Sequence, residues 1–330
     1  MVVDTHAHII LPEITREYAP EEGWRPRVFL QDGRQVVDYK GKQIRSAIRP
    51  FVHIEEILEA QAQAGVDRMI LCPWVNLLRY EVEPGEALRT SRIQNRSLAR
   101  LASGYPGRIY GLGTVPLQDP ELAARELESW MAEPGIFGVE VAASVRGAYL
   151  GDGRFRPFWA AAEQSGALVF IHPTTRGFDA PVFGQYYLWN SVGNPLETTI
   201  TAAHMIMAGV MQGHPRLKVL LAHGGGALLA LRGRLRHAHS FQPQAKASLG
   251  ETPEASLKRF YFDSLTHDLG LLRDLVDFVG PDHVLVGSDY PFDMGAEHPA
   301  EIVRQLERPL EEEAKILSGN ALNLLHKEDR

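Results

Sequence analysis

The 330-residue chain lacks most of the features that mark secreted and membrane proteins. It has one cysteine, Cys72, which excludes an internal disulfide framework and fits a reducing cytoplasm. No apolar run reaches the roughly 18 residues that a membrane span needs. The apolar start is interrupted by Asp4, His6 and His8, unlike the apolar region of a signal peptide. We therefore predict a cytoplasmic protein without membrane contacts.

The chain has no excess of positive charge: it contains 34 basic and 41 acidic residues, and its net charge is −7. There is no long basic run, and this argues against a nucleic acid as the main partner. The chain shows no low-complexity linker and no repeat of fixed period. Its composition, 45% hydrophobic and 23% charged, is that of an ordinary globular protein. We predict one domain over residues 1–330.

What the chain does have is a series of eight short apolar runs, most of them apolar throughout. Such runs are typical of parallel strands that are buried on both faces. Segments with helical spacing lie between them, for example the one that begins at Asp119-Pro120 and stops at Pro134-Gly135. The runs are VVDTHAHI, DRMILCPW, RIYGLGTVP, IFGVEVAA, ALVFIHP, LKVLLAHGG, RFYFDSL and HVLVGSDYP.

Eight strand–helix units in series predict an α/β fold, a (β/α)8 TIM barrel, which typically needs about 250 residues. The remaining residues lie in three places. Residues 12–50 form an insertion after the first strand, a small cap with a hairpin around Asp32-Gly33. Residues 174–195 form a long loop after the fifth strand, and residues 310–327 form an extra C-terminal helix.

Potential metal ligands fall at the ends of four predicted strands. His6 and His8 end the first strand on one face, His172 ends the fifth, His223 the sixth and Asp289 the eighth. The carboxyl ends of barrel strands surround one mouth, where active sites lie, so we expect these side chains to converge. Three histidines and a carboxylate suit zinc, although manganese or iron also fits. The fourth strand, IFGVEVAA, has no lysine to bridge a second ion, which favours a single metal.

Taken in order, these motifs resemble a known family. DTHAH, HP after the fifth strand, HGGG and SDYPF are similar to motifs of the amidohydrolase superfamily. The resemblance is to the branch containing aminocarboxymuconate-semialdehyde decarboxylase and related metal-dependent aromatic-acid decarboxylases. It runs nearly end to end, through VPLQD at 115–119, P-x-E-T at 195–198 and LSGNA at 317–321.

The resemblance implies roles for individual residues. It implies that His6, His8, His172 and Asp289 bind the metal and that His223 is the acid/base beside it. Asp289 then counts as catalytic together with His223. A neutral histidine in that place can accept a proton and later return one to the carbon that loses carboxylate.

Two arginines resemble the carboxylate-binding residues of the branch, Arg49 in SAIRPF and Arg234 in LRGRLRHA. The planar guanidinium suits this role because it pairs with a carboxylate through two parallel hydrogen bonds. In relatives the second arginine reaches the site of a neighbouring subunit, which implies a homodimer. Arg232 and Arg236 flank it, so the choice among the three stays open.

Other polar and aromatic residues suggest how the site is supported and walled. Asp263, at the end of the seventh strand, is placed to orient a metal ligand, and residues 183–190 (FGQYYLWN) form a candidate wall of the substrate pocket. The semialdehyde decarboxylase has a tryptophan after its HP, whereas this chain has Thr174, Thr175 and then Arg176. The match therefore supports the reaction class better than one substrate.

These observations predict a metal-dependent, oxygen-independent decarboxylase of a small unsaturated or aromatic carboxylic acid. A second interpretation keeps the site but makes the protein a hydrolase or hydratase acting on a lactone, amide or alkene. A third is a barrel without activity that serves as a binding or scaffold protein.

Overall fold

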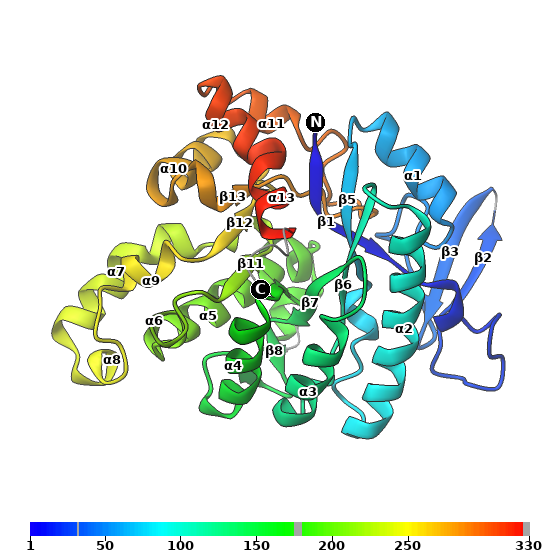
Figure 1. Cartoon of the computed structure of the whole chain (residues 1–330), viewed down its shortest axis with the longest axis horizontal. Coiled ribbons are helices and arrows are strands. Elements are labelled where there is room, and N and C mark those ends of the chain that lie inside the picture. The colour runs from blue at the N-terminus through cyan, green and yellow to red at the C-terminus, as the bar shows by residue number, and fades with distance from the viewer. Residues whose placement is uncertain (32, 175–179, 326–330) are drawn as a thin grey trace.

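The computed structural model describes residues 1–31, 33–174 and 180–325. Eight parallel strands follow one another around a nearly closed barrel, each paired with the next in chain order (Figure 1). The strands are β1 (Val3–Ile9), β5 (Arg68–Pro73), β6 (Ile109–Gly113), β7 (Ile136–Ala142), β10 (Leu168–His172), β11 (Lys218–Leu221), β12 (Tyr261–Asp263) and β13 (Val284–Leu285). All eight predicted runs become barrel strands, and the predicted (β/α)8 fold is confirmed.

The ring closes between its first and last strands. The backbone N–H of Thr5 donates to Val286 O at 2.8 Å, and that of Asp289 donates to His6 O at 2.8 Å. The buried Asp4 carboxylate accepts the backbone N–H of Ser288 at 3.0 Å. Closure therefore joins the DTHAH and SDYP motifs directly, although they lie at opposite ends of the sequence.

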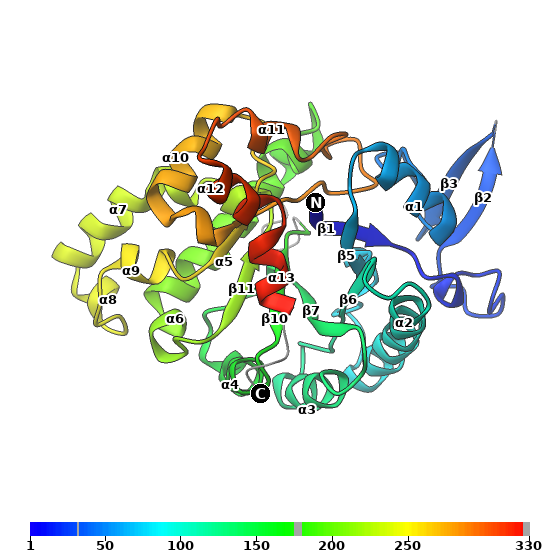
Figure 2. The same ribbon diagram turned by 45° about the horizontal axis from the view of Figure 1, so that its top comes forward.

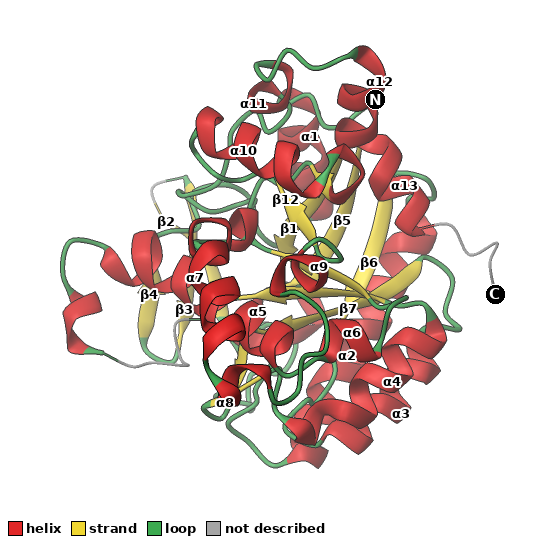
Figure 3. Cartoon of the chain, turned by 90° about the vertical axis from the view of Figure 1, so that its left-hand side faces the viewer, coloured by secondary structure: helices red, strands yellow, loops and turns green. Residues whose placement is uncertain are grey.

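Helices enclose the strands on the outside of the barrel (Figure 3). Some of them begin at a side-chain cap: Asp119 accepts the N–H of Leu122 at 3.0 Å, and Asp268 accepts that of Leu271 at 2.6 Å. The helices are α1 (Ile54–Gln63), α2 (Pro84–Gly104), α3 (Pro120–Trp130), α4 (Arg156–Ser165), α5 (Asn194–Met207), α6 (Val210–Gly213), α7 (Leu228–Phe241), α8 (Pro243–Lys246), α9 (Pro253–Leu257), α10 (Leu269–Val279), α11 (Glu301–Arg304), α12 (Leu310–Ala314) and α13 (Asn320–Leu325). None of the described helices has the length and apolarity that crossing a membrane requires.

The insertion after β1 forms a small antiparallel sheet of β2 (Arg27–Gln31), β3 (Arg34–Tyr39) and β4 (Lys42–Ile44). The predicted hairpin is confirmed, since β2 and β3 pair up to Gln31 opposite Arg34, while Asp32 itself lies outside the described residues. The third strand was not predicted, because three residues are too few to show a pattern. A further small hairpin, β8 (Ser144–Val145) with β9 (Ala148–Tyr149), follows β7.

The other two extra segments also take the predicted places. Residues 310–325 form helical turns that end in α13, which lies beside the barrel strands (Figure 2). The apolar side chains of α13 belong to one buried cluster with Val3, Ile70 and Leu168 of three barrel strands. The predicted end of this helix, residues 326–327, lies outside the described residues. In the loop after β10, two short helical turns cover Pro181–Gly184 and Trp189–Gly193 before α5 begins. Thr175 and Arg176 also lie outside the described residues.

Candidate metal centre

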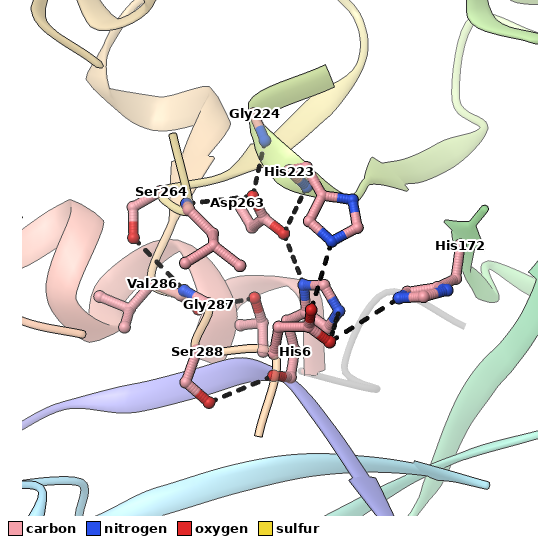
Figure 4. Close-up of polar contacts among 12 residues, drawn as sticks. His6, His172, His223, Gly224, Asp263, Ser264, Val286, Gly287 and Ser288 are labelled. Carbon is pink, nitrogen blue, oxygen red and sulfur yellow. Dashed lines mark hydrogen bonds and ion pairs between the residues drawn. The ribbon is translucent and has the colours of Figure 1, made fainter. Parts of the chain in front are cut away.

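The five predicted metal-site residues meet at the carboxyl ends of the strands. Figure 4 shows three of them, His6, His172 and His223, around one point. His6 and His8 lie on β1, His172 ends β10, His223 follows β11 and Asp289 follows β13. One ligand atom from each of His6, His172, His223 and Asp289 lies within 4.8 Å of the others. These side chains form a site for a divalent metal ion.

Four side-chain atoms at this point are buried and have no hydrogen-bond partner: Nε2 of His6, His8 and His172, and Oδ1 of Asp289. The three nitrogens lie 3.2, 3.4 and 3.9 Å, respectively, from that oxygen. A buried polar atom left unpaired costs about 1–3 kcal/mol. A cation held between these atoms removes that cost, and nitrogen and oxygen donors suit zinc or manganese. The residues therefore fit a resident metal.

In two of these imidazoles, the Nδ1 atom, which points away from the Nε2 cluster, lies next to an oxygen atom. His6 Nδ1 lies 2.7 Å from Asp263 Oδ2, and His172 Nδ1 lies 2.9 Å from Pro173 O. An acceptor at Nδ1 keeps the ring proton there and leaves the Nε2 lone pair for a metal. Asp263 thus lies behind a ligand, as the sequence analysis expected.

His223 is placed differently from the other histidines. Its Nε2 lies 3.4 Å from Asp289 Oδ2, and its backbone N–H donates to Asp263 Oδ2 at 2.9 Å. Both His223 and Asp289 have left-handed backbones, with φ of 57° and 55°. Non-glycine residues adopt this region rarely, and it is found most often at functional sites. The glycines after His223 allow close packing: a Cβ on Gly226 would lie 2.1 Å from Pro195 O.

The buried charges in the site depend on one another. Burial alone would lower the pKa of His6, but Asp289 and Asp263 together raise it to about 10. Burial lowers the pKa of His172 to about 3, so this imidazole is neutral at pH 7. Burial would raise the pKa of Asp289, yet His6, His172 and His223 hold it well below its usual value. Without metal, a proton on His6 balances the Asp289 carboxylate.

A cavity of 340 Å³ opens onto the metal site. The predicted wall, residues 183–190, contributes three side chains to it, and Tyr187 Oη donates to Asp293 Oδ1 and Oδ2 at 2.9 and 3.0 Å. The lining residues are Gln43, Ile44, Arg45, Ser46, Trp74, Val75, Asn76, His172, Pro173, Thr174, Tyr187, Trp189, Asn190, Asn194, Asp289, Phe292 and Asp293.

The two predicted carboxylate binders are not among these lining residues. Arg49 borders a neighbouring cavity, and its Nη1 donates to Phe292 O at 3.4 Å. Arg234 lies exposed on α7. Arg45, four residues before Arg49, does line the cavity and was not predicted from the sequence. The segment IRSAIR contains both arginines, so it pointed to the region but not to the residue.

Comparison with known proteins places the chain in a family. Residues 3–327 match the amidohydrolase family model. The chain belongs to the amidohydrolase family. It is 32% identical over 333 residues to 2-amino-3-carboxymuconate-6-semialdehyde decarboxylase of Dictyostelium discoideum, an alignment that covers 98% of this chain and 91% of the relative. It is 31% identical over 257 residues to 6-methylsalicylic acid decarboxylase of Penicillium expansum, covering 74% and 77% of the two chains.

Solved structures of decarboxylases share the fold. The 5-carboxyvanillate decarboxylase of Novosphingobium aromaticivorans, complexed with manganese and 4-hydroxy-3-methoxy-5-nitrobenzoic acid, matches with a TM-score of 0.84 at 22% identity, covering 98% and 96% of the chains. The enzyme of the same name from Sphingomonas paucimobilis matches with a TM-score of 0.81 at 24% identity, covering 98% of both. The family model and the sequence relatives confirm two predictions: the branch of metal-dependent decarboxylases and the enzyme class, a carboxy-lyase.

Proposed function

We propose that this protein is a metal-dependent, oxygen-independent decarboxylase of a small unsaturated or aromatic carboxylic acid. One observation carries the proposal. Nε2 of His6, His8 and His172 and Oδ1 of Asp289 are buried and unpaired around one point, and His223 lies beside them. Two sequence relatives of the chain are named as decarboxylases.

In this proposal His6, His8, His172 and Asp289 hold the metal, and His223 stays free. Zinc is our choice because three imidazoles and one carboxylate suit it, and manganese, present in a structural relative, is the alternative. A bound divalent ion supplies electrostatic stabilisation of the negative charge that develops on the substrate.

His223 is the proposed acid/base, with Asp289 as its catalytic partner. Its Nε2 lies 3.4 Å from Asp289 Oδ2, so the carboxylate that takes part in metal binding also orients the imidazole. His223 delivers a proton to the substrate carbon that bears the carboxylate. The bond between that carbon and the carboxylate then breaks, its electron pair returns to the substrate, and carbon dioxide leaves.

Arg45 is the proposed anchor of a substrate carboxylate, because its side chain lines the cavity. Trp74 and Phe292 line the same cavity and suit a flat, unsaturated substrate. Arg49 supports this wall through its hydrogen bond to Phe292 O. Arg234, exposed on α7, acts in our proposal on the site of a partner subunit in a homodimer.

The remaining proposals concern the whole chain. Residues 1–330 make one metal-dependent barrel domain, with residues 12–50 as a cap, and the protein works in the cytoplasm. Cys72 is buried and reduced, which fits that compartment.

The test is carbon dioxide release by metal-free protein reloaded separately with zinc and manganese. The panel contains 2-amino-3-carboxymuconate-6-semialdehyde, 6-methylsalicylate, 2,6-dihydroxybenzoate and 5-carboxyvanillate. We expect metal-dependent release from at least one acid, and release at least about 100-fold slower from the His223→Asn variant. His237→Asn, which changes an exposed histidine on α7, is the control and should retain activity.

Two results would contradict the proposal. Equal release by metal-free and metal-loaded protein would remove the metal from the reaction. Turnover of lactones, amides or alkenes without carbon dioxide release would favour the hydrolase or hydratase interpretation.

A further inference from the structure

Glu140 is a carboxyl group in the interior of the barrel that no step of the proposed reaction uses. It lies on β7, the fourth barrel strand, where the sequence reads IFGVEVA, and it is fully buried. Neither Oε1 nor Oε2 has a hydrogen-bond partner. Such a group is costly to bury, so its position calls for an explanation.

The nearest candidate partner for this carboxyl group is the imidazole of His8. Glu140 Oε1 lies 3.5 Å from His8 Nδ1, and Nδ1 is itself buried and unpaired. A neutral imidazole has one N–H group, on either Nδ1 or Nε2. When Nδ1 carries the hydrogen, it points to Glu140, and the Nε2 lone pair faces Asp289 Oδ1 at 3.4 Å.

The other two proposed histidine ligands are arranged in the same way. His6 has Asp263 Oδ2 at its Nδ1, and His172 has Pro173 O. Each Nε2 in turn faces Asp289 Oδ1. His8 is the remaining member of this set, and Glu140 supplies the oxygen on its far side.

We propose that Glu140 is the positioning residue of His8: it accepts the Nδ1–H hydrogen bond and thereby presents His8 Nε2 to the metal. The two atoms lie 3.5 Å apart, and a hydrogen bond between them would hold the His8 ring in the orientation that a metal at Nε2 needs. The inference rests on the metal site of the proposed function but not on the reaction. The fourth barrel strand has no lysine that could bridge a second metal ion. In this proposal it contributes to the site through Glu140 instead.

The experiment compares metal affinity with the stability of the metal-free protein. Glu140→Leu and Glu140→Met remove the acceptor at similar volume, and Glu140→Gln keeps an amide oxygen in its place. Zinc affinity is measured by competition with a chromophoric chelator, and Tm is measured on metal-free protein. We expect the Leu and Met variants to bind zinc about 10–100-fold more weakly, as is usual when such a partner is lost.

The metal-free Tm of these two variants should stay unchanged or rise, because an unpaired buried carboxyl group is replaced by an apolar one. Glu140→Gln should bind zinc within about threefold of the wild type, since it retains the acceptor. Glu126→Leu is the matched control. Glu126, on α3, is also buried, but it is paired with Arg92 on α2 and with Trp130 on α3, so its loss should lower Tm without changing zinc affinity.

Two results would overturn the inference. Wild-type zinc affinity in Glu140→Leu and Glu140→Met would make Glu140 a bystander. A lower metal-free Tm with unchanged affinity would make it a purely structural residue. Wild-type protein that binds no metal would instead contradict the proposed function itself.

Discussion

At the scale of single residues, Asp263 holds both halves of the site together. Its Oδ2 accepts from His6 Nδ1 at 2.7 Å and from the backbone N–H of His223 at 2.9 Å. Its Oδ1 accepts the N–H of Gly224 at 2.7 Å. Burial would raise the pKa of Asp263, but its contacts with His6 and His223 lower it. One ionised carboxylate therefore fixes His6 and the proposed acid/base, His223, relative to each other.

The first prediction separates the metal ligands from the acid/base. His223→Asn should bind one metal per chain with wild-type affinity, while kcat falls by about 100- to 10,000-fold, the usual contribution of a proton-transfer group. Metal content is measured by mass spectrometry after gel filtration. His223 also belongs to the group of potential ligands whose atoms lie within 4.8 Å of one another. Loss of the metal in this variant would therefore make His223 a ligand and contradict its assigned role.

The second prediction concerns the pH dependence of stability without metal. The folded pKa of His6 is about 10, above the usual 6.5, so protonated His6 stabilises the fold fully below pH 6.5. That contribution is lost as the pH rises through 10. The Tm of metal-free protein should therefore fall between pH 7 and pH 10, and metal-loaded protein should show a smaller fall because the cation takes the place of the proton. Parallel curves with and without metal would contradict this account.

At the scale of secondary-structure elements, the sequence predicted the strands, the capped helices and the residues at strand ends. Each of these leaves a local pattern in the sequence. The strand containing DTHAH and the turn HGGG are examples. The arginine that lines the cavity was not predictable. Arg45 and Arg49 lie on one short segment, and which of them faces the cavity depends on how the cap sheet packs, including the bridge between Ala47 and Phe292. Glu140 was overlooked because a carboxylate in an apolar strand shows its partner only in three dimensions.

The third prediction concerns the loop between β10 and α5. Tyr187 Oη donates to Asp293 at 2.9 and 3.0 Å and so fastens this loop over the cavity. Tyr187→Phe removes a hydrogen bond worth about 1 kcal/mol. KM should rise about fivefold with little change in kcat, measured by steady-state kinetics on the preferred acid. Tyr186→Phe, at a side chain that is 87% exposed, should change neither constant. A fall in kcat alone for Tyr187→Phe would place this residue in the chemistry instead.

At the scale of the whole molecule, barrel closure makes the site. The first and last barrel strands meet where Asp289 N–H donates to His6 O, and no local segment holds more than two of the five site residues. On the outside, α7 extends away from the barrel (Figure 1). It exposes 37% of Leu231 and 69% of Phe241, which are apolar groups suited to an interface.

The fourth prediction tests the proposed homodimer and the role of Arg234. Arg234→Ala and His223→Asn chains should each be inactive alone. Hybrid dimers made by mixing them should recover activity, because the site with His223 receives Arg234 from its partner. Light scattering gives the mass, and carbon dioxide release gives the activity. Hybrids as inactive as both parents would place Arg234 outside the partner's site.

The measurement that tests the central claim most directly is anomalous diffraction at the zinc edge from crystals of zinc-loaded protein. We predict one peak per chain, about 2.0–2.2 Å from Nε2 of His6, His8 and His172 and from a carboxylate oxygen of Asp289. A peak elsewhere, no peak at full loading, or a peak bonded to His223 in place of His8 would contradict the account.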